Sequence, residues 1–448
     1  MEQRVRPEFE EQASIASTAK NDRVLNAVAN EETVAPQIAP TSVDMPEVIR
    51  ALRHRDFRLF WFGNFLSNIG TWMQNVAQGW LVLQLAPNNP AFWLGVIGFA
   101  ASAPMLVLAL IGGVIADRVD KRRLMTWTQS SMMLFAIILW GLTYFGKINV
   151  SLIVLLAFAN GVAMSLNTPS YQALVPQLVP REDLTNAIAL NSAQFNMSRV
   201  LGPTLGGLAM ALFGVSGNFL LNALSFVAVL VALMQITYPP VYPATSEATI
   251  WENIVEGFRY LFERKEMSLL MVLTAFASVL GIPYVTFVPL FAKDILHVQE
   301  TGFGMMMACS GAGAFLGAAT IAYLRNIRCR GAFVVRAALA FYAGIIAFSF
   351  SRNFVLSGLL LAVIGYSMIL MVATINALLQ HLAADEMRGR VMSIYATAFL
   401  GFAPIGSLLA GTLADNIGAP YTIASMSAVA LIATVVLYMR RKELRCVD

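Results

Sequence analysis

The sequence has few charged residues and little of what a catalytic or metal site requires. Only 12% of its 448 residues are charged and 58% are hydrophobic, whereas a soluble domain carries roughly 25% charged residues. The three cysteines and three histidines are dispersed, so no metal or haem site can be assembled from them at standard spacings. A Gly-x-x-x-x-Gly-Lys nucleotide loop is missing as well. We therefore expect no cofactor, no metal, no enzymatic activity and no ATP-driven pumping.

Acidic residues are absent from most of the apolar part of the chain. The stretches without Asp or Glu are 57–116, 124–180, 184–246, 301–384 and 387–414. Carriers coupled to a proton usually keep a buried carboxylate that binds and releases it. The proton is the coupling ion we consider, but the apolar segments offer no evident group to bind it.

Long apolar segments fill most of the sequence. A spanning helix needs about 20 apolar residues to cross a hydrocarbon core of about 30 Å. Twelve segments meet this requirement, near 58–84, 92–116, 124–145, 150–175, 185–212, 217–237, 268–292, 302–323, 332–351, 354–379, 389–414 and 420–439. The predicted fold class is an all-α integral membrane protein with twelve transmembrane helices in two pseudo-symmetric six-helix halves.

The basic residues gather in alternate loops. One set of loops holds clusters such as Arg118 to Arg123 and Arg440 to Lys442, whereas the opposite loops hold only Lys147, Lys293 and Arg352. By the positive-inside rule, this asymmetry predicts that both termini are cytoplasmic. It also explains the net charge of +4 without nucleic-acid binding, which we do not expect.

An internal repeat divides the chain. A shift of about 204 positions places Gly202, Gly207 and Gly214 on Gly406, Gly411 and Gly418 without a gap, and duplicated halves are the usual plan of secondary transporters. The expected parts are a disordered tail (1–48), an N-terminal half (49–237), a cytoplasmic linker (238–267), a C-terminal half (268–440) and a short tail (441–448). In the linker, Thr249-Ile-Trp-Glu252 is a capping box that predicts the start of an amphipathic helix.

A polar motif joins the second and third predicted spans. It reads Gly113-Val-Ile-Ala-Asp117-Arg118-Val-Asp120-Lys121-Arg122-Arg123. Gly113 permits close helix approach at the membrane edge, and Asp117 can pair with an arginine or cap the next helix. We interpret Gly113, Asp117, Arg118 and Arg122 as a conformational latch at the cytoplasmic mouth; the alternative is a plain basic loop.

The fifth span contains a proline flanked by glycines, in the run Arg199-Val-Leu-Gly202-Pro203-Thr-Leu-Gly206-Gly207. The proline removes a backbone donor, and the glycines let the helix bend and approach its neighbour. Such a helix can seal the interface between two halves, although a kinked packing helix would have the same sequence.

Polar residues share one face of the first span, at offsets of four and three: Asn64, Asn68, Thr71, Asn75 and Gln78. A polar stripe is unlikely to face lipid, so these are candidates for a substrate cavity. Further candidates come from the fourth, seventh and tenth spans: Asn160, Tyr171, Tyr284 and Asn376. The alternative is hydrogen bonding between helices, which contributes only about 0.6 kcal/mol per contact.

Arg199 is the basic residue predicted deep inside a span. An arginine there costs about 2.5–3.5 kcal/mol on insertion scales, so it requires a partner or water. It is a candidate for attracting an anionic substrate, such as a catecholate or carboxylate. The alternative, which we favour on sequence alone, is a structural role with backbone carbonyls, Asn160 or Asn196 as partners.

These motifs resemble those of the major facilitator superfamily. The loop at Asp117 is similar to the family's signature, with Asp120 in place of its second glycine, and the fifth span is similar to its exporter motif, with Ser198 in place of the upstream glycine. The segment 168–187 is similar to a branch of siderophore exporters and macrolide and drug efflux proteins. The resemblance covers residues 50–440.

The resemblance implies an exporter of a siderophore or drug-like molecule that works by alternating access, driven by an ion gradient. It also implies a lipid-embedded monomer in a bacterial inner membrane. One departure concerns coupling, because Ala157 stands where the family's fourth-span arginine belongs. The alternatives are an importer of the same fold and, from another class, a membrane enzyme or sensor.

Overall fold

The computed structural model describes residues 49–237, 250–324 and 329–440. Within these ranges every regular element is a helix, and no strand occurs. The predicted tails (1–48 and 441–448) and the capping residue Thr249 lie outside the described residues.

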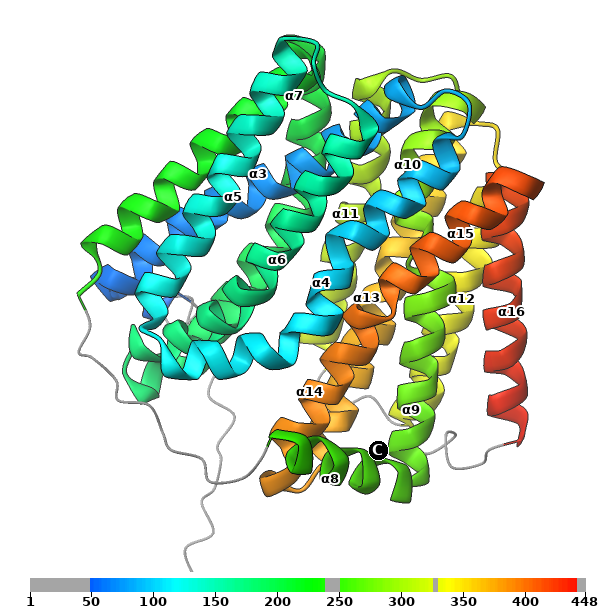
Figure 1. Cartoon of the computed structure of the whole chain (residues 1–448). Helices are drawn as coiled ribbons and strands as arrows, with labels where there is room; N and C mark the ends of the chain where they lie inside the picture. Colours follow the sequence, from blue (N-terminus) through cyan, green and yellow to red (C-terminus); the bar gives the residue numbers. More distant parts are fainter. Residues whose placement is uncertain (1–48, 238–249, 325–328, 441–448) are drawn as a thin grey trace, which may run out of the picture. The chain divides into compact units, whose positions relative to one another are not determined.

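The first six spans run from α3 to α7 (Figure 1). The elements up to that point are η1 (Arg50–Arg53), α3 (Arg55–Leu85), α4 (Pro90–Arg118), α5 (Lys121–Tyr144), α6 (Val150–Leu174), the short turns η2 (Val175–Gln177) and η3 (Arg181–Asp183), and α7 (Leu184–Gln235). Asp120, which departs from the family motif, caps α5, because its side chain accepts a hydrogen bond from the Arg123 backbone N–H at 2.7 Å.

The last six spans follow the surface helix α8 (Ile250–Glu263). They are built from α9 (Lys265–Phe276), η4 (Ala277–Gly281), α10 (Tyr284–Leu290), η5 (Phe291–Ile295), α11 (Glu300–Tyr323), α12 (Arg330–Phe350), α13 (Phe354–Leu382), α14 (Asp385–Gly401), α15 (Ala403–Ile417) and α16 (Ala419–Arg440). Nine helical stretches of the described chain are long and apolar enough to span a membrane. One of them, Arg181–Gln235, contains two spans, and α3 and α4 complete the predicted twelve.

Two glycines separated by 204 positions make the same turn. Gly214 reverses the chain inside α7 with φ 71° and ψ 177°, and Gly418 separates α15 from α16 with φ 84° and ψ 147°. Residues with a Cβ rarely adopt such positive φ values. The repeat in the sequence therefore corresponds to a repeated backbone turn.

The seventh and eleventh spans are broken, whereas we expected continuous helices over 268–292 and 389–414. Pro283 and Pro289 each remove a backbone donor from the seventh span, and Pro404 lies at the break in the eleventh. Ser278 bridges the two irregular segments, since its hydroxyl donates to the Phe399 carbonyl at 2.7 Å.

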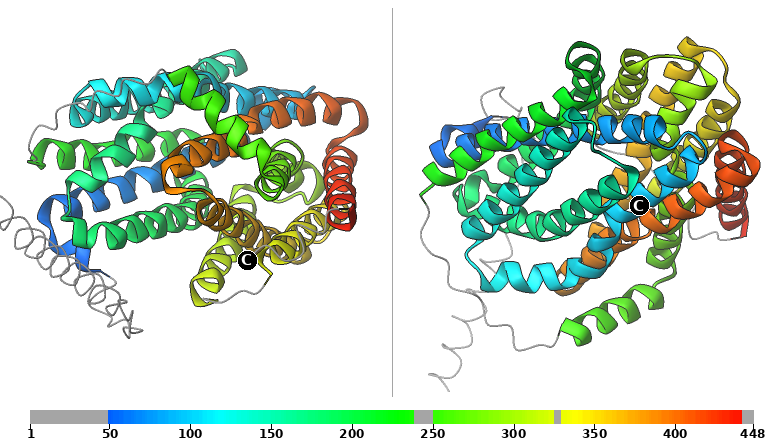
Figure 2. Two further views of the ribbon diagram at one scale, coloured as in Figure 1. Left: turned by 90° about the horizontal axis from the view of Figure 1, so that it is seen from below. Right: turned by 45° about the horizontal axis from the view of Figure 1, so that its top comes forward.

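Helix α8 lies against the beginning of α14 (Figures 1 and 2). Arg390 pairs with Glu256 at 2.6 Å, and the Ala384 N–H donates to the Tyr260 hydroxyl at 2.9 Å. Leu261 of α8 is buried. These contacts confine α8 to one end of the bundle, which we call the α8 end; the opposite end, where α3 ends and α4 begins, is the far end.

Two pairs of glycines join the first six spans to the last six near the far end. A Cβ added to Gly207 in α7 would lie 2.6 Å from the Cα of Gly304 in α11, and one added to Gly411 in α15 would lie 3.0 Å from the Cα of Gly95 in α4. Real Cβ atoms do not come as close as 2.6 Å to another heavy atom. The two backbones can therefore touch only because the glycines have no side chains. We call these four residues the glycine seal.

Hydrogen bonds reinforce the same end of the interface. The Trp80 indole N–H donates to the Glu300 carboxylate at 2.9 Å, and the Lys293 ammonium donates to the Leu83 carbonyl at 2.9 Å. Each bond links α3 to the last six spans. The far end is therefore held closed by backbone contact and by polar contacts together.

Replacing Gly207 by valine tests the glycine seal. The added side chain must force α7 and α11 apart, and overpacking of this kind typically costs about 1–3 kcal/mol. We expect a lower midpoint of thermal unfolding in detergent. Gly141→Val in α5 is the matched control, because a Cβ there meets nothing within 4 Å; equal effects of the two variants would contradict the packing argument.

Candidate functional site

A cavity of about 580 Å³, lined by both polar and apolar side chains, lies among α3, α5, α6 and α7. None of its lining side chains is charged. Seven of them carry a carboxamide: Asn64, Asn68, Gln129, Asn167, Gln172, Asn191 and Asn196. Carboxamides both donate and accept hydrogen bonds, so this cavity suits a molecule rich in hydroxyl, amide or carboxyl groups.

Helix α3 contributes one wall of the cavity and is fixed by hydrogen bonds. The Trp61 indole N–H donates to the Leu190 carbonyl of α7 at 3.0 Å, and the Asn222 amide donates to the Gln74 side chain at 2.7 Å. On the cavity face, the Asn64 amide donates to the Phe60 carbonyl at 2.9 Å. The remaining Asn64 oxygen is thus oriented by its own helix.

Side chains from α5 and α6 hold one another in place behind the cavity surface. The Asn167 side-chain oxygen accepts hydrogen bonds from the Thr128 hydroxyl at 3.0 Å and from the Gln129 side-chain amide at 3.3 Å. Tyr171 stacks on Phe60 with ring centroids 5.3 Å apart. A preorganised polar wall of this kind loses little side-chain entropy when a ligand binds.

The structure brings together four of the predicted cavity residues and not the others. Asn64, Asn68, Thr71 and Tyr171 line the cavity. The predicted residues outside its lining are Asn75, Gln78, Asn160, Arg199, Tyr284 and Asn376. Asn75 is exposed, Gln78 and Tyr284 are buried, and the Asn376 side-chain oxygen accepts from the Gln380 side-chain amide within α13.

Sequence reasoning missed several lining residues. Gln129 lies in the polar run Thr126-Trp-Thr-Gln-Ser-Ser131 of the third span, and this run could have identified it. Gln172, Asn191 and Ser192 also line the cavity, but they lie near the ends of their spans. Polar residues at span ends are expected next to water, so no local signal separates them from loop residues.

The glycines of the exporter motif pack on two different helices. A Cβ on Gly202 would lie 2.4 Å from the Trp72 Cβ, and one on Gly206 would lie 3.1 Å from the Met73 Cα, both in α3. Gly207, next along the chain, faces α11 instead. Pro203 lies inside α7 between these contacts, so the motif joins α3, α7 and α11.

The predicted latch is described only in part. Gly113, Asp117 and Arg118 lie in α4, and their side chains are outside the described residues. The Arg122 guanidinium donates to the Met234 carbonyl at 2.7 Å, near the end of α7. This contact links the motif loop to the sixth span at the α8 end.

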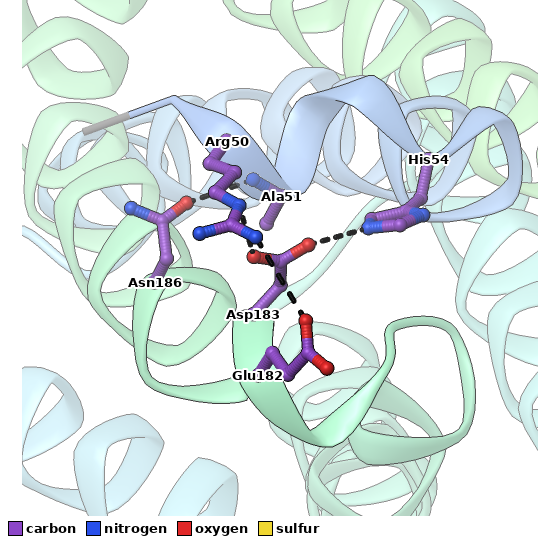
Figure 3. A network of polar contacts seen from close by, with 6 residues as sticks. All are labelled: Arg50, Ala51, His54, Glu182, Asp183 and Asn186. Atoms are coloured by element: carbon purple, nitrogen blue, oxygen red, sulfur yellow. Dashed lines mark hydrogen bonds and ion pairs between the residues drawn. The ribbon is translucent and has the colours of Figure 1, made fainter. Parts of the chain in front are cut away.

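A second polar cluster fastens the segment before α3 to the start of α7 (Figure 3). Asp183 forms an ion pair with Arg50 at 2.9 Å and lies 2.7 Å from the His54 ring nitrogen, while the Asn186 side chain accepts the Ala51 N–H at 2.9 Å. The Asp183 side chain is 9% exposed. The cluster therefore positions α3 and α7, two of the helices that line the cavity.

Helices that span the membrane, a sealed far end and an uncharged polar cavity together define a membrane transporter. The described residues contain no group of His, Cys, Asp and Glu that could hold a metal ion.

The sequence model of the family described as "Transmembrane secretion effector" matches residues 48–448, and the chain belongs to this family within the major facilitator superfamily. It is a secondary transporter that exports small molecules, and it is not an enzyme.

Three known proteins are similar in sequence to most of this chain. The chain is 28% identical to the staphyloferrin A transporter of Staphylococcus aureus, with 87% of this chain and 97% of the relative covered. It is 26% identical to the multidrug efflux pump Tap of Mycolicibacterium fortuitum (84% and 94% covered) and to the enterobactin exporter EntS of Shigella boydii (84% and 88% covered). In fold it is similar to the nucleoside transporter NupG, with a TM-score of 0.68, 13% identity, and 87% and 99% covered.

Asn68→Leu tests whether the cavity binds the transported molecule. It removes a carboxamide from the lining, and an unmade hydrogen bond costs about 1–3 kcal/mol. We expect transport to fall about tenfold or more at limiting substrate. Asn75→Leu is the matched control, since Asn75 lies on the same helix outside the cavity; export assays on both variants should separate them, and equal losses would argue against the cavity.

Asp183→Ala tests the second polar cluster. Removing this nearly buried carboxylate takes away the ion pair of Arg50 and the 2.7 Å contact of His54, and we expect the free energy of unfolding to fall by about 1–3 kcal/mol. Glu182→Ala should change it by less than about 0.5 kcal/mol, because Glu182 is 82% exposed and lies 3.8 Å from Arg50. Thermal unfolding of both variants in detergent measures the difference, and an Asp183 variant as stable as wild type would refute the anchoring role.

Proposed function

We propose that this transporter exports a siderophore-type molecule from the cytoplasm of a bacterium by alternating access. The observation that carries the proposal is the uncharged, carboxamide-rich cavity of about 580 Å³. Siderophores are rich in hydroxyl, amide and carboxyl groups, which carboxamides can bind. Relatives named as a staphyloferrin A transporter and an enterobactin exporter support the same substrate class.

The proposed orientation places the α8 end in the cytoplasm. Basic residues are concentrated in the loops at that end, including Arg122, Arg123 and Arg390, in keeping with the positive-inside rule. Both termini would then be cytoplasmic in the bacterial inner membrane. The glycine seal would close the extracellular side, and the cavity would receive substrate from the cytoplasm.

Export requires the two six-helix halves (49–237 and 268–440), joined by the linker 238–267, to rock about the substrate site. Opening the far end separates Gly207 from Gly304 and Gly95 from Gly411. Closing the α8 end would engage the latch of Gly113, Asp117, Arg118 and Arg122. During this motion, Gly202, Pro203 and Gly206 would keep α7 packed against α3. The protein would work as a monomer surrounded by lipid.

An ion gradient supplies the energy in this proposal, with the proton as the candidate ion. The first six spans contain no buried acid of the usual kind. Carboxylates do lie near span ends, among them Asp117, the nearly buried Asp183, the exposed Asp415 and Asp56, whose side chain accepts the Thr237 N–H at 3.2 Å. A proton would therefore bind near a membrane surface and not in the cavity.

A second candidate function is drug efflux. Met132, Met164, Ile188 and Phe195 add an apolar portion to the cavity lining, and a relative is named as a multidrug efflux pump. An amphipathic compound with one hydrogen-bonding edge would fit such a mixed surface.

Secretion by cells separates the two candidates. A strain deleted for the transporter should retain siderophore, measured by mass spectrometry of cells and medium, and complementation should restore its secretion. The Asn68→Leu variant should restore it poorly and the Asn75→Leu variant fully. Normal secretion by the deletion strain, with lower resistance to macrolides or dyes, would contradict siderophore export and favour drug efflux.

A further inference from the structure

Arg199 carries a positive charge in the interior of α7 with no negative partner. No carboxylate pairs with it among the described residues, and it donates no hydrogen bond to any oxygen there. Its one hydrogen-bond contact is to the Met368 sulfur at 3.8 Å, a weak acceptor. A guanidinium has five N–H donors, so this environment leaves most of them unused.

The structural role that we favoured from sequence has no support in these contacts. Asn160 makes no hydrogen bond with Arg199, and the Asn196 amide donates instead to the Ser192 carbonyl at 2.8 Å. An arginine inside a span normally satisfies its donors through carbonyls, water or a partner charge. The missing acceptor must therefore come from outside the described chain.

Trp72 forms a platform beside the guanidinium. The Arg199 Cζ lies 5.8 Å from the centroid of the Trp72 ring, within the range of a cation–π contact. Gly202 permits this arrangement, since a Cβ there would lie 2.4 Å from the Trp72 Cβ. The Trp72 ring also contacts Phe195 edge to face, with centroids 6.2 Å apart.

The platform adjoins the polar cavity. Thr71 precedes Trp72 in α3, Asn196 lies one turn before Arg199 in α7, and both residues line the cavity. On its other side Arg199 touches Met368 of α13. It therefore lies between the cavity and the last six spans, where a transported molecule can contact both sets of helices.

We propose that Arg199, positioned by Trp72, binds an anionic group of the transported molecule. The chemical class is a carboxylate or a deprotonated catecholate, whose paired oxygens match the planar donors of a guanidinium. The cavity carboxamides bind the neutral hydroxyl and amide groups of the same molecule. This inference rests on the proposed function and makes the substrate an organic anion.

Two isosteric probes test the inference on the full-length protein in nanodiscs. 2,3-Dihydroxybenzoate is an anion at neutral pH, whereas 2,3-dihydroxybenzamide has the same ring without the carboxylate charge. By isothermal titration calorimetry, wild type should bind the benzoate about tenfold tighter than the benzamide. Arg199→Gln should bring the two affinities to within about twofold, and Arg199→Lys, which keeps the charge without the planar donors, should retain part of the preference.

Arg336→Gln is the matched control, because Arg336 is an exposed arginine in the apolar helix α12. It should keep the full preference. An unchanged preference in Arg199→Gln would overturn the proposal, as would a wild type that binds the two probes equally or binds neither. If Arg199→Gln does not fold, Arg199→Lys decides, and a wild-type preference in that variant overturns the proposal.

The secretion assay keeps this inference distinct from the proposed function. If the complemented strain secretes siderophore while Arg199→Gln secretes it equally well, the anion site is refuted and siderophore export stands. If the deletion strain secretes normally, siderophore export fails, and the probe titration still tests Arg199.

Discussion

The close approach of helix backbones at the glycine seal is the constraint on which the rest of the structure depends. Within a bilayer, helices gain little from the hydrophobic effect, so they associate through packing of small residues and polar contacts. Gly207 with Gly304 and Gly95 with Gly411 bring α7 to α11 and α4 to α15 without intervening side chains. Such contacts are made fully or lost, because no flexible side chain can fill a gap between two glycines. This favours an interface with two discrete states, as alternating access requires.

The cavity relies on neutral polar groups. Seven carboxamides provide donors and acceptors without the cost of placing a charge in the membrane interior. Some of these groups are held within the protein, as Asn167 is by Thr128 and Gln129, whereas the buried Asn191 side-chain oxygen has no hydrogen-bond partner among the described residues. Arg199 differs from these groups in carrying a charge, and it contacts Met368 and Trp72. Arg199 therefore places a positive charge beside a cavity whose lining carries none.

The sequence predicted the helices and their polar faces, but not which residues along a polar face line the cavity. The offsets of Asn64, Asn68, Thr71, Asn75 and Gln78 place them on one face of α3, and only the first three line the cavity. Beyond Thr71, α3 contacts α7 and then the last six spans, as the Trp80–Glu300 bond shows. Periodicity identifies a face, whereas the neighbour of that face at each turn depends on how the helices cross. The glycine repeat was also readable, but the partners Gly304 and Gly95 depend on packing between distant segments.

The broken seventh span illustrates a different limit. Pro283 and Pro289 are visible in the sequence, but the surrounding residues are apolar enough to predict one continuous helix. Whether a proline kinks or breaks a membrane helix depends on which groups satisfy the freed carbonyls. Ser278 and the break in the eleventh span supply part of the answer, and they come from the tertiary structure.

Distances between spin labels at the two ends of the bundle test the central claim most directly. One pair of labels replaces Phe145 and Tyr421, exposed residues at the far end, and a second replaces Trp127 and Val255, exposed residues toward the α8 end. When a transported siderophore is added to the protein in nanodiscs, double electron–electron resonance should show a longer distance between the far-end labels and a shorter distance between the labels toward the α8 end. Distances that stay fixed, or that change in the same direction at both ends, would contradict alternating access about the glycine seal.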